Sequence, residues 1–233
     1  MRIAEIYVSK QGEGALTGTP SVFVRASGCN LRCWFCDTPF TSWQPTGDDH
    51  SVPEITERVL AHGERHVVLT GGEPLLFAEL VPLTVALRVA GRHLTIETAG
   101  TLYQPVACDL MSISPKLANS TPSADLAGRW HARHEQERWV PTVVARFLRE
   151  YACQLKYVVD QPEDLAEIDA QLAELAALVP EGVRGDQLWL MPQGTNPVEL
   201  AERAAWLQPL CAQRGWNYCP RMHIEWYGHT RGT

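Results

Sequence analysis

The stretch Cys29-Asn30-Leu31-Arg32-Cys33-Trp34-Phe35-Cys36 places three cysteines within eight residues. Such a local run is typical of metal or redox chemistry in a cytosolic enzyme. Three thiolates can bind three irons of a cubane [4Fe–4S] cluster and leave the fourth iron without a protein ligand. An open iron can bind and reduce a small molecule, whereas a cluster that only carries electrons normally has four cysteine ligands. The spacing therefore predicts a cluster with an open coordination position.

Two other interpretations of the three cysteines stay open at this point. They could belong to a structural zinc site that a distant His or Cys completes, or to disulfides in a secreted chain. Residues 1–5 contain no apolar core of a signal peptide, and the seven cysteines of the chain are an odd number. Disulfides are therefore disfavoured, and we expect a cytoplasmic location.

Composition limits the class of protein further. The 233 residues, of which 45% are hydrophobic, suit one domain with a substantial core. No apolar run approaches the ~20 residues that a membrane span needs. The net charge of −7 disfavours nonspecific nucleic-acid binding, which requires a basic surface. We expect neither a membrane nor a nucleic acid as a direct partner, and the oligomeric state stays open, a homodimer included.

Strand and helix patterns alternate along most of the chain. Strands are predicted at 21–26, 67–70, 94–98, 110–114, 155–159 and 188–191, and helices at 52–62, 75–90, 163–178 and 197–214. Ser51 is the expected N-cap of the first of these helices. Such alternation indicates a parallel sheet with right-handed crossovers. About six β/α units fall short of the eight that close a barrel, so we predict an α/β fold, a partial, open TIM-like barrel.

One segment, 119–151, interrupts this alternation. Within it, residues 124–138 are rich in Arg, His and Glu, and we interpret them as a solvated helix or loop. A metal-binding role for His131 and His134 is the less favoured alternative.

Polar residues follow most of the predicted strands. In parallel α/β folds that edge of the sheet is where ligands bind. A tight turn could explain any one of these groups, but together they predict a binding site next to the cysteine segment. The groups are Gly71–Pro74, Glu97–Thr101, Ser114–Lys116 and Pro192–Thr195, with Lys156 on the fifth strand.

The cysteine spacing resembles that of the radical S-adenosylmethionine (radical SAM) enzymes, and Gly71-Gly72-Glu73-Pro74 resembles the motif by which they hold the methionyl amine. The whole chain is similar to the 7-carboxy-7-deazaguanine synthase family within that superfamily. The matching segments are Gln11–Gly14, Phe23–Cys33, Cys36–Thr38, Thr70–Pro74, Glu97–Gly100, Ser114–Lys116, Lys156–Val159, Pro192-Gln193 and His223. The segment 119–151 matches no family motif, and 221–228 matches the closing motif only loosely.

This resemblance implies a role for each matching residue. Cys29, Cys33 and Cys36 would ligate the [4Fe–4S] cluster, and Thr38 a magnesium ion. The SAM site would comprise Phe35, Asp37, Gly72, Glu73, Ser114, Pro115, Lys116 and Gln193. The substrate site would comprise Lys10, Gln11, Gly12, Glu13, Arg25, Thr70, Glu97 and His223. The chain would be one domain over 1–233, with the cluster loop near 29–38 and a segment near 216–233 that closes over the substrate.

The implied activity is a radical ring contraction of 6-carboxy-5,6,7,8-tetrahydropterin to 7-carboxy-7-deazaguanine in queuosine and 7-deazapurine biosynthesis. The 5′-deoxyadenosyl group of SAM takes a hydrogen from C6, ammonia leaves, and SAM is regenerated. An external one-electron donor such as flavodoxin or ferredoxin would supply the electron. The cofactors carry the difficult chemistry, and the protein positions the reacting carbon.

Two other functions stay under consideration from the residues. An activase that installs a glycyl radical on a partner enzyme shares the cysteine spacing, but it needs a protein-binding groove. A non-enzymatic zinc-binding module would leave the polar residues at the strand ends unexplained.

Overall fold

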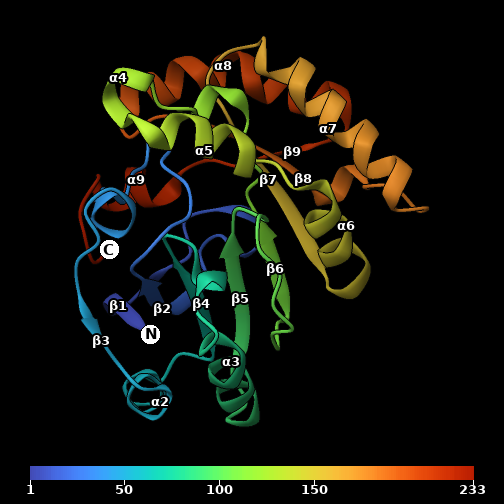
Figure 1. Cartoon of the computed structure of the whole chain (residues 1–233). Helices are drawn as coiled ribbons and strands as arrows, with labels where there is room; N and C mark the ends of the chain where they lie inside the picture. Colours follow the sequence, from blue (N-terminus) through green and yellow to red (C-terminus); the bar gives the residue numbers. More distant parts are fainter.

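Nine strands form one continuous sheet in the order β3-β1-β2-β4-β5-β6-β7-β8-β9 (Figure 1). The computed structural model describes all residues, 1–233. The strands are β1 (Arg2–Lys10), β2 (Pro20–Ala26), β3 (Asp48–Asp49), β4 (His66–Gly71), β5 (His93–Thr98), β6 (Leu110–Ile113), β7 (Cys153–Val159), β8 (Leu188–Pro192) and β9 (Asn217–Tyr218). From β2 onward each neighbouring pair in this order is parallel.

Helices lie in most of the connections between the parallel strands and surround the curved sheet, whereas β5 and β6 are joined by a loop (Figure 1). They are α1 (Pro39–Ser42), α2 (Val52–Leu60), α3 (Leu80–Val89), α4 (Ala124–Ala127), α5 (Arg129–Glu137), α6 (Pro141–Glu150), α7 (Asp164–Leu178), α8 (Pro197–Arg214) and α9 (Met222–Tyr227). The strands β2, β4, β5, β6, β7 and β8 supply the six predicted units. The prediction of an open, partial barrel is therefore confirmed.

A local sequence signal explains where helix α2 begins, whereas the start of α3 differs from the prediction. Ser51 caps α2 as predicted, because its hydroxyl accepts from the Glu54 N–H while the Glu54 carboxylate accepts from the Ser51 N–H at 2.7 Å. The prediction of one helix over 75–90 was wrong at its start. A short 3₁₀ turn covers Pro74–Leu76, Phe77 is extended, and α3 begins only at Leu80.

The first strand, β1, was not predicted. It pairs antiparallel with β2 along most of its length and carries the short strand β3 on its other edge. Because antiparallel edge strands mix polar and apolar residues, the first ten residues lack the continuous apolar pattern of the buried parallel strands. This strand matters for the site, because it places Glu5 beside Arg25 and Tyr7 beside Phe23 of β2.

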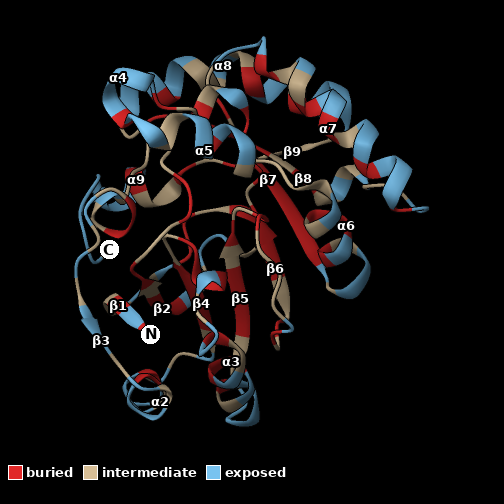
Figure 2. Cartoon of the chain, viewed as in Figure 1, coloured by how far each residue is buried: buried red, intermediate tan, exposed pale blue.

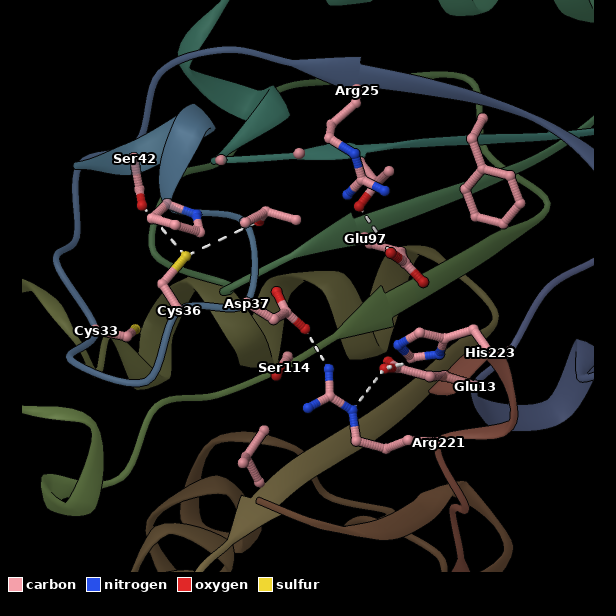
Figure 3. A pocket seen from close by; sticks show the side chains of 18 of the residues that line it. Glu13, Arg25, Cys33, Cys36, Asp37, Ser42, Glu97, Ser114, Arg221 and His223 are labelled. Atoms are coloured by element: carbon pink, nitrogen blue, oxygen red, sulfur yellow. Dashed lines mark hydrogen bonds and ion pairs between the residues drawn. The ribbon is translucent and has the colours of Figure 1, made fainter. Parts of the chain in front are cut away.

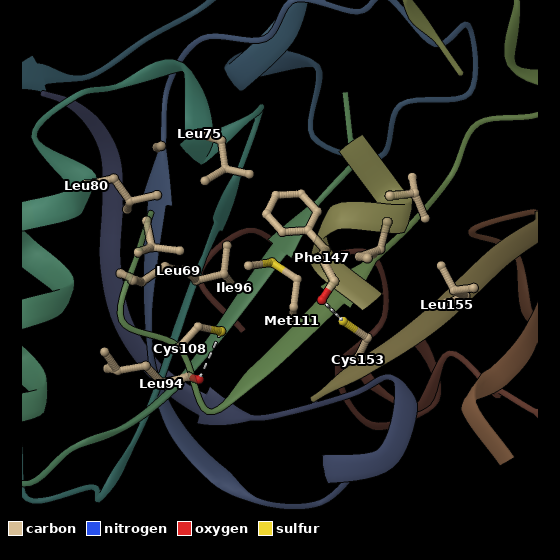
Figure 4. Packing of buried hydrophobic residues seen from close by; sticks show 14 of the residues in the cluster. Leu69, Leu75, Leu80, Leu94, Ile96, Cys108, Met111, Phe147, Cys153 and Leu155 are labelled. Carbon is tan, nitrogen blue, oxygen red and sulfur yellow. Dashed lines mark hydrogen bonds between the residues drawn. The ribbon is translucent and has the colours of Figure 1, made fainter. Parts of the chain in front are cut away.

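The hydrophobic core lies between the sheet and its helices, where the strands are almost continuously buried (Figure 2). Figure 4 shows Leu69, Leu94 and Ile96 of the strands packed near Leu80 and Phe147 of the helices. Each fully buried side chain of this size contributes about 1.5–3 kcal/mol. The carboxyl ends of the parallel strands are not taken up by this core and can carry polar groups.

Four of the seven cysteines lie outside the 29–36 segment and are buried in the interior. Cys108, Cys153, Cys211 and Cys219 are buried free thiols. Three of them donate weak S–H hydrogen bonds. Cys108 donates to the Leu94 carbonyl at 3.6 Å and Cys153 to the Phe147 carbonyl at 3.3 Å (Figure 4), and Cys219 donates to the Pro220 carbonyl at 3.7 Å. They act as small hydrophobic residues.

None of the helices combines the length and the apolar character that crossing a lipid bilayer would demand.

Candidate functional site

One cavity of about 480 Å³ lies at the carboxyl ends of the parallel strands, within the roughly 300–1,000 Å³ of typical ligand sites. Most of the residues singled out from the sequence line it, and Figure 3 shows Cys36 at one end with Arg221, Glu13 and His223 at the other. The lining residues among them are Lys10, Gln11, Gly12, Glu13, Arg25, Cys29, Cys33, Phe35, Cys36, Asp37, Thr38, Thr70, Gly72, Glu97, Ser114, Lys116, Gln193 and His223.

Glu73 and Pro115 do not line this cavity; both are buried. The Glu73 carboxylate accepts hydrogen bonds from the Leu75 N–H at 3.1 Å and from the Thr98 hydroxyl and the Ala99 N–H at 2.9 Å. Burial raises its pKa above the ordinary value for glutamate. Glu73 thereby ties the end of β4 to the end of β5.

The glycine pair before Glu73 forms part of the cavity wall instead. A Cβ on Gly72 would lie 2.1 Å from the Gly28 carbonyl oxygen, and Gly71 has a φ of +120°. Only glycine fits here, because the turn after β4 lies directly against the start of the cysteine loop. The two segments are also joined by a hydrogen bond from the Glu73 N–H to the Gly28 carbonyl at 2.8 Å.

The three cysteines of the loop after β2 all reach the cavity. Burial raises the pKa of the Cys29 thiol to about 12 and of the Cys33 thiol to about 11. The Ser42 hydroxyl donates to Cys36 Sγ at 3.2 Å, and the Leu31 N–H lies 3.4 Å from Cys29 Sγ. Hydrogen bonds of this kind orient thiolate ligands and tune the potential of a cluster.

Helix α5 packs directly against the cysteine loop. His134 is fully buried, accepts from the Arg32 N–H at 3.1 Å through Nδ1, and lies 2.9 Å from the Ser120 hydroxyl through Nε2. Burial lowers the pKa of His134 to about 4, so the ring is neutral at pH 7. The interpretation of 124–138 as a solvated helix or loop therefore holds for most of these residues, which are helical and exposed, but not for the buried His134. The charges around His134 in the sequence gave no sign that this residue is buried.

We expect His134→Ala to destabilise the protein and loosen the cysteine loop. The change leaves the part-buried Arg32 N–H without its acceptor, which costs about 1–3 kcal/mol, while the Ser120 hydroxyl loses one contact but keeps its hydrogen bond to the Leu117 carbonyl at 2.7 Å. Urea unfolding of the metal-free proteins and iron content after reconstitution measure the two effects. His131→Ala, on the same helix but only half-buried, is the matched control. Equal stability and equal iron content in the two variants would contradict this role.

Hydrogen-bond acceptors form the wall opposite the cysteines. Glu97 accepts from the Thr70 hydroxyl at 2.7 Å and from the Gln11 side-chain N–H at 3.2 Å. The Lys156 ammonium lies 3.6 Å from Glu97 and 2.7 Å from Glu13. Two carboxylates around one buried lysine create a surface that suits the N–H edge of a planar ring.

Glu13 stays ionised despite its burial. Burial alone would raise its pKa, but the charges of Lys156 and Arg221 hold it well below the ordinary value. Burial likewise disfavours the charged form of Lys156, and Glu13 and Glu97 together outweigh that effect and raise its pKa. These side chains form one charged network on the cavity wall.

Arg25 is held in place by two residues of the neighbouring strand. Its Nε donates to the Glu5 carboxylate at 2.7 Å and one Nη to the Tyr7 hydroxyl at 2.6 Å. Glu5 lies directly opposite Arg25 in the register, and Tyr7 stacks on Phe23 with ring centroids 5.2 Å apart. The guanidinium is therefore oriented before any ligand arrives.

Sequence reasoning missed several residues that line this cavity. Glu5 and Tyr7 could have been found from their i, i+2 spacing, had β1 been recognised as the partner of β2. Arg221, two residues before His223, is buried and pairs with Asp37. The C-terminal residues 229–233 also line the cavity; they fall within the segment near 216–233 that was expected to close over the substrate, although none of them was named individually.

A cysteine loop after the first parallel strand, a glycine pair after the second, and a six-unit open barrel define a radical SAM protein. The radical SAM superfamily model matches residues 23–119. Proteins named 7-carboxy-7-deazaguanine synthase match almost the whole chain. The protein from Rhodopirellula baltica is 46% identical over 99% of this chain and 88% of its own length, and that from Halobacterium salinarum 45% over 95% and 88%. The chain belongs to the 7-carboxy-7-deazaguanine synthase family.

A solved structure supports the fold. The crystal structure of QueE from Escherichia coli aligns with a TM-score of 0.71, over 95% of this chain and 94% of that one, at 24% identity. These relatives do not favour the two other functions considered from the sequence, the glycyl-radical activase and the zinc-binding module.

The residues present fit the cofactors that the superfamily implies, a [4Fe–4S] cluster and SAM. The donor set is three thiols on one loop with no fourth cysteine in the cavity, which leaves one iron open. The raised thiol pKa values mean that a bound metal must stabilise the thiolate forms. Gly71 and Gly72 line the cavity beside the loop, so this part of the wall has no side chain between the backbone and a ligand.

Proposed function

We propose that this chain converts 6-carboxy-5,6,7,8-tetrahydropterin to 7-carboxy-7-deazaguanine with release of ammonia, a step of queuosine and 7-deazapurine biosynthesis. One observation carries the proposal: a single cavity holds the three loop cysteines on one side and Arg25, Glu13 and Glu97 on the other. When bound, the cluster and SAM supply the radical chemistry. The family to which the chain belongs supports the same reaction.

The chain's own residues bind and orient the substrate. Arg25, already fixed by Glu5 and Tyr7, presents its free guanidinium N–H groups to the substrate carboxylate. Glu13 and Glu97 accept from the N–H groups of the pterin edge. His223 lies over Gly12, where a Cβ would come within 2.5 Å of its Nδ1. These contacts hold the saturated ring between the two walls of the cavity.

SAM occupies the side of the cavity nearest the cysteines. The glycine at 72 gives the methionyl group access to the backbone, and Phe35 and Asp37 flank the adenine. Ser114, Lys116 and Gln193 surround the ribose and carboxylate, and the Lys116 ammonium is placed by a 2.7 Å hydrogen bond to Ser114 Oγ. Glu73 and Pro115 contribute from behind this wall by fixing the strand ends.

The whole chain acts as one domain, with the C-terminal segment near 216–233 closing the site. Arg231 pairs with Glu5 at 2.9 Å and lies over the Phe40 ring at 4.1 Å, and His229 contacts the Asp37 carbonyl at 2.9 Å. The segment thus spans from β1 to the cysteine loop, which excludes water from the substrate. An external one-electron donor such as flavodoxin or ferredoxin completes the system.

Magnesium binds at Thr38, two residues after the last cysteine. Its hydroxyl lies 3.9 Å from Cys36 Sγ and 3.4 Å from the Thr41 hydroxyl, and it does not cap the helix α1 that follows. A hard cation that prefers oxygen ligands and keeps several waters can bridge this hydroxyl to substrate oxygens.

We expect Thr38→Val to raise the Mg²⁺ concentration needed for half-maximal turnover about tenfold, because the variant keeps the shape but loses one oxygen ligand. Turnover should slow at fixed Mg²⁺, while the cluster chromophore and SAM binding stay normal. Thr46→Val, on the exposed side of the same loop region, is the control. An unchanged Mg²⁺ titration with a normal rate would exclude Thr38 as the ligand.

An anaerobic assay tests the proposed function. The reconstituted protein is mixed with SAM, Mg²⁺, dithionite and the tetrahydropterin carboxylate, and products are followed by mass spectrometry. We expect 7-carboxy-7-deazaguanine and ammonia in equal amounts. If SAM is cleaved equally with and without the pterin and no deazaguanine forms, the proposal is contradicted.

A further inference from the structure

A buried arginine joins three parts of the cavity wall that are far apart in the sequence. Arg221 precedes α9 directly and is 7% exposed. One Nη donates to the Gly194 carbonyl at 2.5 Å, immediately after Gln193, and the other pairs with Asp37 of the cysteine loop. Its Nε lies 3.4 Å from Glu13 Oε1 (Figure 3). Arg221 therefore contacts both the SAM side and the substrate side of the cavity.

The Arg221 Nε is buried but forms no hydrogen bond within the protein. The nearest acceptor is one oxygen of Glu13, whereas the other oxygen is fixed by Lys156 at 2.7 Å. A buried N–H without an acceptor is unfavourable, so a small rotation of Glu13 about its fixed oxygen would complete the pair. The position of Glu13 thus depends on where Arg221 is held.

We propose that Arg221 is a positioning residue that couples the binding of SAM to the binding of the substrate, through its simultaneous contacts with Gly194, Asp37 and Glu13. This inference rests on the proposed function. A ligand beside Gln193 and Asp37 restrains both anchors of the guanidinium, and the guanidinium in turn fixes the free oxygen of Glu13. Glu13 is then aligned before the pterin arrives.

Coupling of this kind is reciprocal. If SAM tightens substrate binding by some factor, the substrate must tighten SAM binding by the same factor, and couplings of about 5–150-fold are typical. This factor is the ratio of the substrate dissociation constant without SAM to the substrate dissociation constant with SAM. Loss of a residue with a purely structural role would weaken one or both affinities without changing that ratio. The ratio is therefore the quantity that distinguishes the two roles.

Calorimetric titration under anaerobic conditions measures the coupling. The dissociation constant of 6-carboxy-5,6,7,8-tetrahydropterin is determined with and without saturating SAM, without reductant so that no turnover occurs. The proteins are the cluster-loaded wild type, Arg221→Gln, Arg221→Lys and, as a control, Arg203→Gln, whose side chain pairs with Asp160 outside the cavity. The visible absorbance of the cluster is checked for each protein.

We expect at least fivefold coupling in the wild type and in Arg203→Gln, and a ratio near one in Arg221→Gln. Arg221→Lys keeps the charge with fewer directed N–H groups and should retain part of the ratio. If Arg221→Gln loses its cluster, the test rests on Arg221→Lys, and a ratio below that of the wild type in this variant supports the inference. A wild-type ratio in every variant, or no coupling in a wild type that binds both ligands, would overturn the inference. A wild type that binds no pterin would instead overturn the proposed function.

Discussion

Replacing Cys29, Cys33 or Cys36 with alanine is expected to abolish both the iron chromophore and turnover. In the proposed cluster each thiolate would hold a different iron, so no remaining ligand could substitute for the one that is lost. The absorbance at ~400 nm that thiolate-ligated clusters show should disappear, together with SAM cleavage. The measurements are iron and sulfide content, the visible spectrum and 5′-deoxyadenosine release in anaerobic protein.

The buried cysteines provide matched controls for these variants. Cys108, Cys153 and Cys211 lie in the hydrophobic core, away from the cavity. Alanine at any of them removes one buried sulfur and should cost about 1 kcal/mol of stability, while the cluster and turnover persist. A full cluster that survives the loss of Cys33 would show that the ligands are assigned incorrectly.

Arg25→Lys is expected to weaken substrate binding by about 10- to 150-fold and to leave SAM binding nearly unchanged. Lysine keeps the charge, but its three N–H groups radiate from one nitrogen and cannot reproduce the planar guanidinium, which binds Glu5 and Tyr7 through different nitrogens and still faces a carboxylate. The loss of a charge-assisted hydrogen bond costs about 1.5–3 kcal/mol, which corresponds to that range of affinity.

Separate titrations of the pterin and of SAM measure the effect of Arg25→Lys. Arg2→Lys is the control, because Arg2, the first residue of β1, is exposed and does not line the cavity. Tyr7→Phe removes one of the two groups that orient Arg25 and should weaken substrate binding in the same direction by a smaller factor. Equal weakening of both ligands by Arg25→Lys would point to a structural role in the sheet.

The features that could be predicted from the sequence depend on local patterns. The buried parallel strands are short apolar runs, so Val67–Thr70 and Leu155–Val159 were recognised within β4 and β7. The polar groups after these strands followed from the geometry of parallel sheets. The three loop cysteines are adjacent in the chain, and the structure brings all of them to the cavity.

The features that were missed depend on contacts between distant residues. Arg221 pairs with Asp37, which is 184 positions away, and Arg231 reaches Glu5 across 226 positions. His134 contacts the Arg32 backbone through one turn of a helix whose other faces are charged. No pattern along the chain distinguishes these residues from ordinary surface charges, because only the folded sheet brings their partners near.

The most direct measurement follows one hydrogen atom from the substrate to the cofactor. The tetrahydropterin carboxylate is deuterated at C6 and incubated anaerobically with the protein, SAM, Mg²⁺ and reductant. If the substrate is held between Arg25 and the cysteine side of the cavity, deuterium should appear at the 5′ carbon of recovered SAM or 5′-deoxyadenosine. Formation of 7-carboxy-7-deazaguanine with no deuterium in either adenosyl compound would contradict that arrangement.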